Sequence, residues 1–191
     1  ASALEAGADV VVTGRVTDAA LVIGPAAWWH GWDFDGGDLD AMAGALVAGH
    51  VIECGAQASG GNYPFFREVP GLEHVGFPIA EVAADGTSVI TKHPDTGGLV
   101  SPGTVTAQLL YEVGDEHYLN PDVSARFDTI EIDQVGRDRV RLSGIRGESA
   151  PDTLKVGINY LGGFRNSMTL VLTGADTAEK ADIAIRTICG I

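Results

Sequence analysis

The sequence predicts a single α/β domain over residues 1–191, with a mixed sheet. We expect a parallel strand–loop–helix unit near the N-terminus and antiparallel hairpins in the second half. The run DVVVT at 9–13, rich in β-branched residues and bounded by glycines, is typical of a strand buried on both faces. Apolar residues recur at helical spacing over 39–54. Asp85-Gly86 separates two short strand-like runs, which is a strong hairpin signal.

Composition limits the classes of protein to which the chain can belong. Its 191 residues are 45% hydrophobic and 20% charged, which fits a globular domain with one core. No apolar run reaches the roughly 18 residues that span a bilayer. The formal charge of −14 and the scattered Lys and Arg residues argue against nucleic acid, but not against a small anionic substrate in a locally positive pocket. Two cysteines, without a signal peptide, predict a cytoplasmic protein.

The first elements of the chain suggest a unit that begins elsewhere. Residues 1–15 read as the end of a helix followed by a buried strand, although a βαβ unit should have an earlier strand. We therefore expect the chain to be a fragment that lacks its first strands, unless the boundary was set by cloning. Thr17 or Asp18 is expected to cap a helix over 19–24, and Pro25 to start or kink the next turn.

The remaining elements follow from spacing and turn residues. Asp38 is the expected N-cap of the helix over 39–54, and Gly55 its stop. A long loop over 55–70 leads to the hairpin strands 79–82 and 87–91. A helix is expected over 104–113 and another from Asp176. Antiparallel pairs are expected for 127–134 with 139–145 and for 154–160 with 167–173.

The stretch KHPDTGGLVSPGT, residues 92–104, has the composition of an anion-binding loop. It combines two basic side chains, three glycines that permit close approach of a ligand, and hydroxyl donors just before a helix N-terminus. The expected binding residues are Lys92, Thr96, Gly97, Gly98, Ser101 and Thr104, with His93 as acid or base. The alternative is that Ser101 or Thr104 caps the helix and the glycines form turns. The loop matches neither a P-loop nor a dinucleotide fingerprint, so no nicotinamide or P-loop nucleotide cofactor is indicated.

The stretch GRVTD, residues 14–18, is a second candidate because it follows the predicted parallel strand, where α/β proteins build ligand crevices. Arg15 is expected to clamp a carboxylate or phosphate, and Asp18 to orient it. The alternative is an Arg15–Asp18 pair that closes the loop. We expect Arg15 to converge with the turn at Gly97 and Gly98 in an electropositive hollow.

A third candidate spans residues 50–62, HVIECGAQASGGN. His50 and Cys54 share one helix face, so the imidazole could act as acid or base, lower the thiol pKa, or join the thiol in a metal site completed by other residues. The alternative is a core histidine beside an inert cysteine. The stretch that follows is a near miss to a nucleophile elbow and is better read as a polar wall or a surface loop. Its residues are Gln57, Ser59, Gly60, Gly61 and Asn62.

Two further features complete the candidates. The double glycine of NYLGGFRN, residues 159–166, presents Arg165 and Asn166, either as ligand contacts or as a hairpin tip. The aromatic set Trp28, Trp29, Trp32 and Phe34 is expected to be core or a contact in a homo-oligomer.

Together, the motifs GADVVVTGRVTDAAL, AGHVIECGAQASGGN, TKHPDTGGLVSPGTVTAQLLYEVGD and APDTLKVGINYLGGFRNS resemble those of the acyclic terpene utilisation AtuA-like family. The similarity runs over nearly the whole chain, as the middle and later part of the family's N-terminal domain. It implies a role in the breakdown of acyclic terpenes or branched acids through CoA thioesters, which makes an acyl-CoA a candidate substrate. It assigns no catalytic residue.

The leading interpretation is an enzyme that acts on an anionic substrate by polar acid/base chemistry. Within this hypothesis His93 is favoured over His50 because His50 has a packing role on the apolar stripe. The alternative is a non-catalytic acyl-CoA-binding or assembly subunit of the same pathway.

Overall fold

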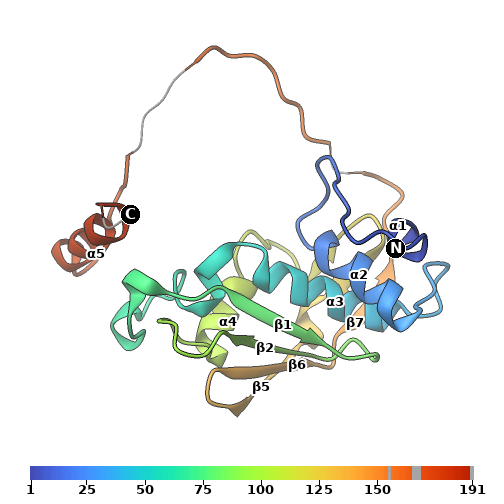
Figure 1. The fold of residues 1–191 in the computed structure, drawn as a ribbon, viewed down its shortest axis with the longest axis horizontal. Helices are drawn as coiled ribbons and strands as arrows, with labels where there is room; N and C mark the ends of the chain where they lie inside the picture. Colours follow the sequence, from blue (N-terminus) through green and yellow to red (C-terminus); the bar gives the residue numbers. More distant parts are fainter. Residues whose placement is uncertain (155, 165–168, 190–191) are drawn as a thin grey trace. The chain divides into compact units, whose positions relative to one another are not determined.

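The computed structural model describes residues 1–154, 156–164 and 169–189. Contacts divide the chain into two compact units, Ala1–Asp152 and Thr153–Ile191. The first unit holds both sheets and helices α1 (Ser2–Glu5), α2 (Ala20–His30), α3 (Leu39–Ile52) and α4 (Pro102–Leu109) (Figure 1). In the second unit the helix is α5 (Thr177–Cys189). The predicted α/β class with antiparallel hairpins is confirmed.

The two sheets are antiparallel. The first has the order β1 (Pro78–Val82), β2 (Ser88–Lys92), β6 (Arg139–Ser143) and β5 (Glu131–Gly136). The second has the order β3 (His117–Leu119), β4 (Val123–Arg126) and β7 (Arg146–Ser149). Short 3₁₀ turns lie at η1 (Gly55–Ser59), η2 (Phe66–Glu68), η3 (Leu72–His74) and η4 (Phe127–Thr129). Because β2 pairs with β6 rather than with its next strand, the first sheet joins two hairpins that are distant in sequence.

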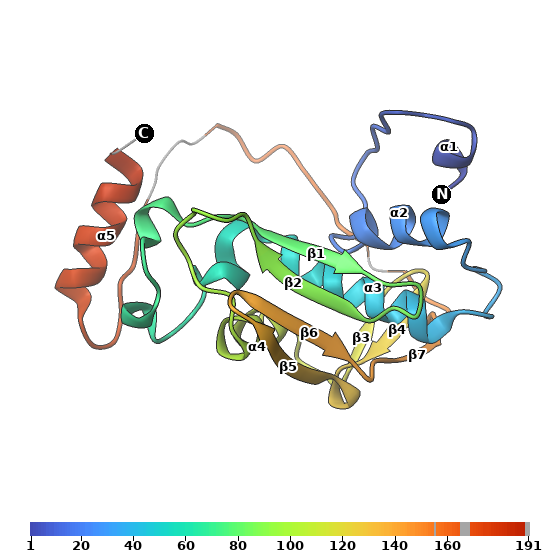
Figure 2. The same ribbon diagram turned by 60° about the horizontal axis from the view of Figure 1, so that its bottom comes forward.

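Helix α3 is the centre of the core. Every residue from Ala41 to Val51 is buried, and the helix contacts strands of both sheets as well as α2 and α4 (Figure 2). Burial on all sides explains why its sequence is apolar on nearly every face. Burial of large side chains such as Met42 and Leu46 stabilises this unit by roughly 1.5–3 kcal/mol each.

Several predicted elements match the structure. The hairpin at Asp85-Gly86 joins β1 and β2, with Gly86 at φ +83° and a hydrogen bond from the Thr87 N–H to Asp85 Oδ1 of 3.0 Å. Helices are found at the expected places for α3, α4 and α5, and β5 pairs with β6. Pro25 lies inside α2 and does not end it. Asp38 is the N-cap residue of α3, but its carboxylate accepts from the Asp33 N–H at 2.8 Å instead of capping the helix.

Two predicted strand assignments are wrong for the described residues. Residues 9–13 form no strand, and Val10 and Val12 are 79% and 91% exposed. A strand needs a neighbour to take its backbone hydrogen bonds, and no described strand pairs with this segment. The N-terminal unit therefore has its loop and helix without its parallel strand. The expected pair at 154–160 and 167–173 is likewise absent from the described part of those segments.

Candidate functional site

The glycine loop before α4 has its backbone donors already engaged. The Gly97 N–H donates to His74 O (3.0 Å), Gly98 to Pro70 O (2.7 Å) and Leu99 to Ser59 O (2.8 Å). An anion at this loop would have to displace these bonds. The N–H groups of Gly97 and Gly98, which the sequence predicts to bind an anion, are therefore not free to do so.

The same glycines permit close packing. A Cβ on Gly97 would overlap the carbonyl of Gly71, and one on Gly98 would lie 2.7 Å from Ser59 O. Gly98 also has φ +96°, a conformation that other residues adopt at a cost. These contacts explain why both positions hold glycine: the loop packs directly against the backbone around residues 59 and 71, where a side chain would not fit.

The hydroxyls at the start of α4 form a capping box. The Thr104 N–H donates to Ser101 Oγ at 3.2 Å, and the Ser101 N–H donates to Thr104 Oγ1 at 3.0 Å. Thr104 is fully buried. Ser101 and Thr104 therefore cap the helix, as the alternative interpretation expected, because their hydroxyls accept from backbone N–H groups that have no partner within the helix.

Lys92 lies at the end of β2 and is nearly buried, with 7% of its side chain exposed. Its Nζ donates to Thr96 O at 2.9 Å and lies 3.8 Å from Asp138 Oδ2. Asp138 also accepts from the Val100 N–H at 2.9 Å and holds φ +51°. This carboxylate therefore ties the β5–β6 turn to the loop before α4, and it neutralises Lys92.

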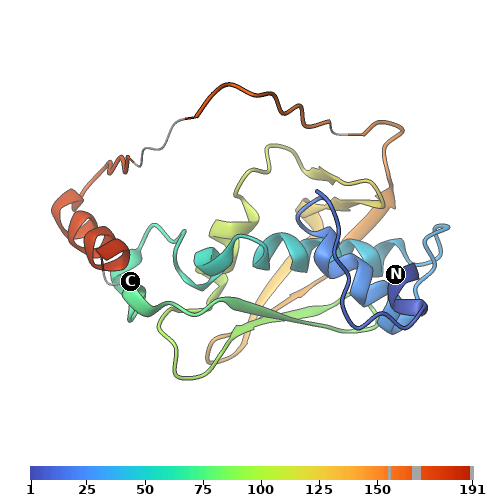
Figure 3. The ribbon, with the colours of Figure 1, turned by 45° about the horizontal axis from the view of Figure 1, so that its top comes forward.

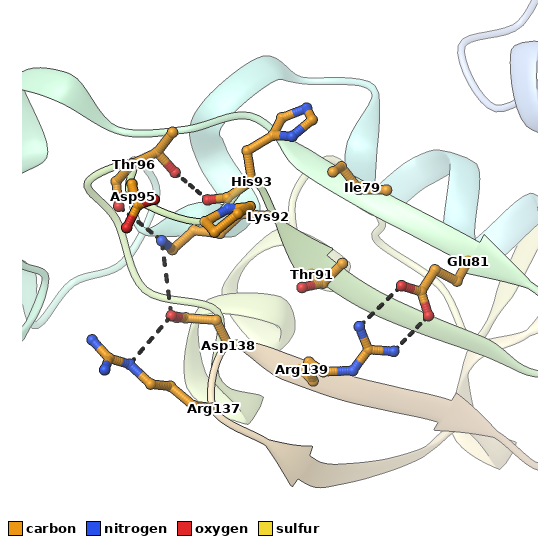
Figure 4. Close-up of a pocket in the computed structure, with 11 residues that line it drawn as sticks. Ile79, Glu81, Thr91, Lys92, His93, Asp95, Thr96, Arg137, Asp138 and Arg139 are labelled. Carbon is orange, nitrogen blue, oxygen red and sulfur yellow. Dashed lines mark hydrogen bonds and ion pairs between the residues drawn. The ribbon is translucent and has the colours of Figure 1, made fainter.

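An open hollow of about 640 Å³ lies beside this pair (Figure 4). It is lined by Ile79, Glu81, Thr91, Lys92, His93, Pro94, Asp95, Thr96, Arg137, Asp138 and Arg139. Apart from the imidazole of His93, three of these side chains are basic and three are acidic. The hollow is thus balanced in charge, unlike the predicted electropositive one, although the chain as a whole carries −14.

The three cations of the hollow differ in their availability. Arg139 is engaged with Glu81 through two hydrogen bonds of 2.9 and 2.5 Å, and this guanidinium lowers the pKa of the Glu81 carboxyl. Lys92 is held by Asp138. Arg137 is 97% exposed, and its Nε lies 3.9 Å from Asp138 Oδ2. Because an exposed contact of that length is worth little, Arg137 is the cation that can most easily turn toward a ligand.

His93 contributes an exposed imidazole to the rim of the hollow. Figure 4 shows the ring pointing away from the Lys92–Asp138 pair, on the side of Ile79. Its backbone is fixed because Thr96 Oγ1 donates to His93 O at 2.7 Å. The side chain is therefore placed on an ordered turn yet open to solvent, a position from which an acid or base can meet a substrate.

Arg15 and Asp18 do not join this hollow. Both are exposed, and no residue that lines the hollow comes from segment 9–18. Figures 1 to 3 place that segment beside α2 and the turn at 93–98 beyond the end of β2. The predicted convergence of Arg15 with Gly97 and Gly98 is wrong because the strand that was to carry Arg15 is not formed. Asp18 instead lies near Tyr118, whose pKa is raised chiefly by burial and also by the Asp18 charge.

His50 is a buried core histidine. Its Nε2 lies 3.1 Å from Gln108 O, and its ring packs against Tyr118 and Phe127 at centroid distances of 5.0 and 5.8 Å. Burial lowers the pKa of His50, so the neutral imidazole is favoured. A solvent-borne substrate has little access to a side chain of a residue that is 3% exposed.

Cys54 is not activated by His50. Burial, together with a hydrogen bond from Sγ to Glu53 Oε1 (2.6 Å), raises the pKa of the Cys54 thiol to about 11. Of the two interpretations, the core histidine beside an unactivated cysteine fits the structure, because burial and the Glu53 carboxylate both disfavour the thiolate. Within the described residues, no group of three or more His, Cys, Asp and Glu side chains is arranged to hold a metal ion.

The stretch 57–62 is mainly structural. Ser59 is fully buried and its Oγ has no partner, so it cannot meet a substrate at the surface as a nucleophile would. Gly60 has φ +117° and is packed against Val69. Asn62 Nδ2 donates to Ala107 O at 3.2 Å. Gln57 and Gly61 belong to the same turn region, away from the lining of the hollow. Arg165 and Asn166 lie outside the described residues.

The sequence prediction missed Glu81, Arg137, Asp138 and Arg139. The triplet RDR directly after Gly136 is a charged turn, and a charged turn alone predicts only a solvated loop. Its relevance arises from the pairing of β2 with β6, which brings the turn beside Lys92.

Residues 1–190 match the family described as acyclic terpene utilisation family protein AtuA. No curated protein and no solved structure matches the chain. Among the described residues, none of the helices is long and apolar enough to pass through a membrane.

Proposed function

The chain belongs to the acyclic terpene utilisation AtuA family, and from this premise we propose that it is an enzyme that acts on an anionic substrate of terpenoid or branched-acid breakdown. The observation that carries the proposal is the hollow in which His93 lies with Lys92, Arg137 and Arg139. Its volume falls in the range of small-molecule sites.

Each side chain of the hollow receives a role that fits its surroundings. Arg137 meets the carboxylate or phosphate of the substrate, because it is the most exposed of the three cations. Lys92 keeps the wall in place through Asp138 and Thr96. His93 acts as acid or base at the rim. An acyl-CoA thioester is the candidate substrate, since it carries phosphates and a polarisable carbonyl.

Two of the catalytic residues predicted from the sequence do not belong to this site. Asp18 was expected to orient the substrate and His50 to serve as a second acid or base. Neither lines the hollow, and His50 is buried elsewhere in the core.

Ligand binding is tested by thermal unfolding with inorganic phosphate, CoA and acyl-CoAs. A ligand at a hundred times its Kd stabilises the protein by about 2.7 kcal/mol. Arg137→Ala should weaken binding about tenfold, as expected for a lost charge-assisted hydrogen bond. Arg141→Ala is the matched control, because Arg141 is paired with Asp133 outside the hollow. Equal binding by wild type and Arg137→Ala would count against the site.

Catalysis is tested on any acyl-CoA that stabilises the protein. His93→Gln should abolish turnover while the binding shift and the thermal midpoint are kept. His74→Gln is the control, because His74 is an exposed histidine outside the hollow. Full turnover by His93→Gln would remove His93 from the mechanism.

The charge balance of the hollow favours one alternative, a subunit that binds an acyl-CoA without converting it. Three carboxylates beside three cations can hold and release an anion without acid/base chemistry. Binding that depends on Arg137, with no turnover of any bound acyl-CoA by the wild type, would support this alternative.

A further inference from the structure

Helix α2 carries an apolar face that its own unit leaves uncovered. At about 100° per residue, the side chains of Leu21, Pro25, Trp28 and Trp29 fall on one side of the helix. We call these four residues the α2 outer face. All four are exposed, with Leu21 at 66% and Trp29 at 75%. The opposite side, with Ile23, is buried against α3.

The helix that carries this face is firmly anchored. Trp32 Nε1 donates to Ala84 O at 2.9 Å, and His30 Nε2 lies 3.1 Å from Val82 O. The His30 and Trp32 rings are stacked at 5.2 Å. Trp32 is thus the core member of the aromatic set, whereas Trp28, Trp29 and Phe34 remain exposed. An anchored helix presents its outer face at little entropic cost.

The α2 outer face is uncharged, which limits its partners. Residues 19–32 contain no Asp, Glu, Lys or Arg, although the whole chain carries −14. A basic partner would find no carboxylate on this helix. A membrane-surface helix usually carries Lys and Arg on its flanks, and α2 has none. The chemistry of the face therefore fits another apolar protein surface.

The order of side chains along α2 makes the face complementary to itself. In an antiparallel pair related by a two-fold axis at Pro25, position 21 of one helix meets position 29 of the other. Leu21 would then pack against Trp29, and the two copies of Pro25, whose side chain is smaller than either of these, would meet at the axis. Trp29 of each copy thus packs against the smaller Leu21 of the other copy, at both ends of the contact.

The size of the face also fits a dimer. With tryptophan side chains of about 150–250 Å² each, the exposed parts of Trp28, Trp29 and Leu21 sum to on the order of 400 Å². A standard interface buries roughly 800 Å² per partner, of which about two thirds is apolar in homodimers. The α2 outer face supplies most of that apolar area. We propose that it is the two-fold interface with a second copy of this chain.

The oligomeric state of the full chain gives the first test. Sedimentation velocity at increasing concentration should show a dimer that tightens with added salt, because two acidic chains repel and the contact itself is apolar. Leu21→Glu should weaken the dimer more than tenfold. Leu110→Glu is the matched control, because Leu110 is 70% exposed and is the C-cap residue of α4, outside the α2 outer face. A monomer at all concentrations, or a dimer equally sensitive to both variants, would overturn the proposal.

Cross-linking tests the geometry without a destabilising charge. In a background of Cys54→Ser and Cys189→Ser, Pro25→Cys should form a disulfide-linked dimer under mild oxidation, because the two copies of position 25 face each other. Leu21→Cys alone should not, since its partner is position 29, and Leu21→Cys with Trp29→Cys should. Cross-linking of Leu21→Cys alone as readily as of Pro25→Cys would contradict the antiparallel pairing. If the protein is a stable monomer that binds uncharged phosphatidylcholine vesicles, the α2 outer face is a membrane contact and the dimer proposal is overturned.

Discussion

His50 shows how a single buried side chain joins two helices. Its Nε2 lies 3.1 Å from Gln108 O, and Gln108 Nε2 donates to His50 O at 3.3 Å, so each side chain bonds the backbone carbonyl of the other residue across α3 and α4. Burial favours the neutral imidazole and lowers the pKa of His50 in the folded chain. Protonation of His50 therefore opposes folding.

This shift predicts a pH dependence of stability. Because the folded pKa lies below the unfolded value of 6.5, the His50 contribution is complete above pH 6.5 and is lost as the pH falls through the folded pKa. Urea unfolding of wild type at descending pH should show this loss. His50→Gln should lack it, and His93→Gln should retain it. The carboxylates of Asp40 and Glu81, whose pKa values are also lowered, add a separate loss at more acidic pH.

A common slope for wild type and His50→Gln between pH 6.5 and 5 would contradict this account. The carboxylates of Asp40 and Glu81 are present in both proteins and contribute equally to both slopes, so the difference between the slopes isolates His50.

At the scale of elements, glycine decides how closely α3 meets its neighbours. A Cβ on Gly44 would overlap the carbonyl of Gly86 in the β1–β2 turn, and one on Gly49 would lie 2.8 Å from Ala19 Cα. Gly86 cannot easily yield, because its φ is +83° and its N–H donates to Ala83 O at 3.0 Å. Gly44 and Gly49 thus determine how closely α3 approaches the hairpin and α2.

We expect Gly44→Ala to lower the free energy of unfolding by about 1–3 kcal/mol, the usual cost of overpacking a core. The gain of up to about 1 kcal/mol in helix propensity acts in the opposite direction and is smaller. Gly114→Ala is the control, because nothing lies within 4 Å of a Cβ at that position. Chemical denaturation measures both variants, and an increase in stability for Gly44→Ala would show that the helix can move away from the turn.

At the scale of the molecule, the two units differ in how their backbones are satisfied. In Ala1–Asp152 the chain is largely folded into helices, strands and hydrogen-bonded turns around one core. In Thr153–Ile191 the residues 156–164 form no helix or strand, and Tyr160 and Phe164 are 88% and 99% exposed. A protease needs an extended segment, which the second unit offers.

Limited digestion with chymotrypsin should therefore cut first after Tyr160 or Phe164 and leave a product close to Ala1–Asp152. Phe65 serves as an internal control, because it is an exposed aromatic residue of the first unit. It lies in a hydrogen-bonded turn, in which the Glu68 N–H donates to Phe65 O at 2.9 Å. Mass spectrometry of the early products identifies the site. Initial cleavage after Phe65 would contradict the difference between the units.

The candidate site was only partly predictable. Lys92, His93 and Thr96 were expected together because they are neighbours in the chain, and they do line one hollow. Arg137, Asp138 and Arg139 were missed because their turn reaches Lys92 only through the pairing of β2 with β6. Arg15 was expected at this site because residues 9–13 were predicted to form a strand, but no described strand pairs with that segment. Spacing cannot reveal such partners, because pairing depends on segments far away in sequence.

The sequence by itself determined the family, the α/β class, helix α3, the Asp85-Gly86 hairpin and the capped start of α4. These features depend on residues within a few positions of one another or on motifs read along the chain. Only the tertiary structure decided which cation of the hollow is most exposed, that the pKa of Cys54 is raised and Ser59 is buried, and that α2 keeps one apolar face exposed. The reason is physical: burial, ion pairing and pKa are set by neighbours in space, which the order of residues specifies only through the complete fold.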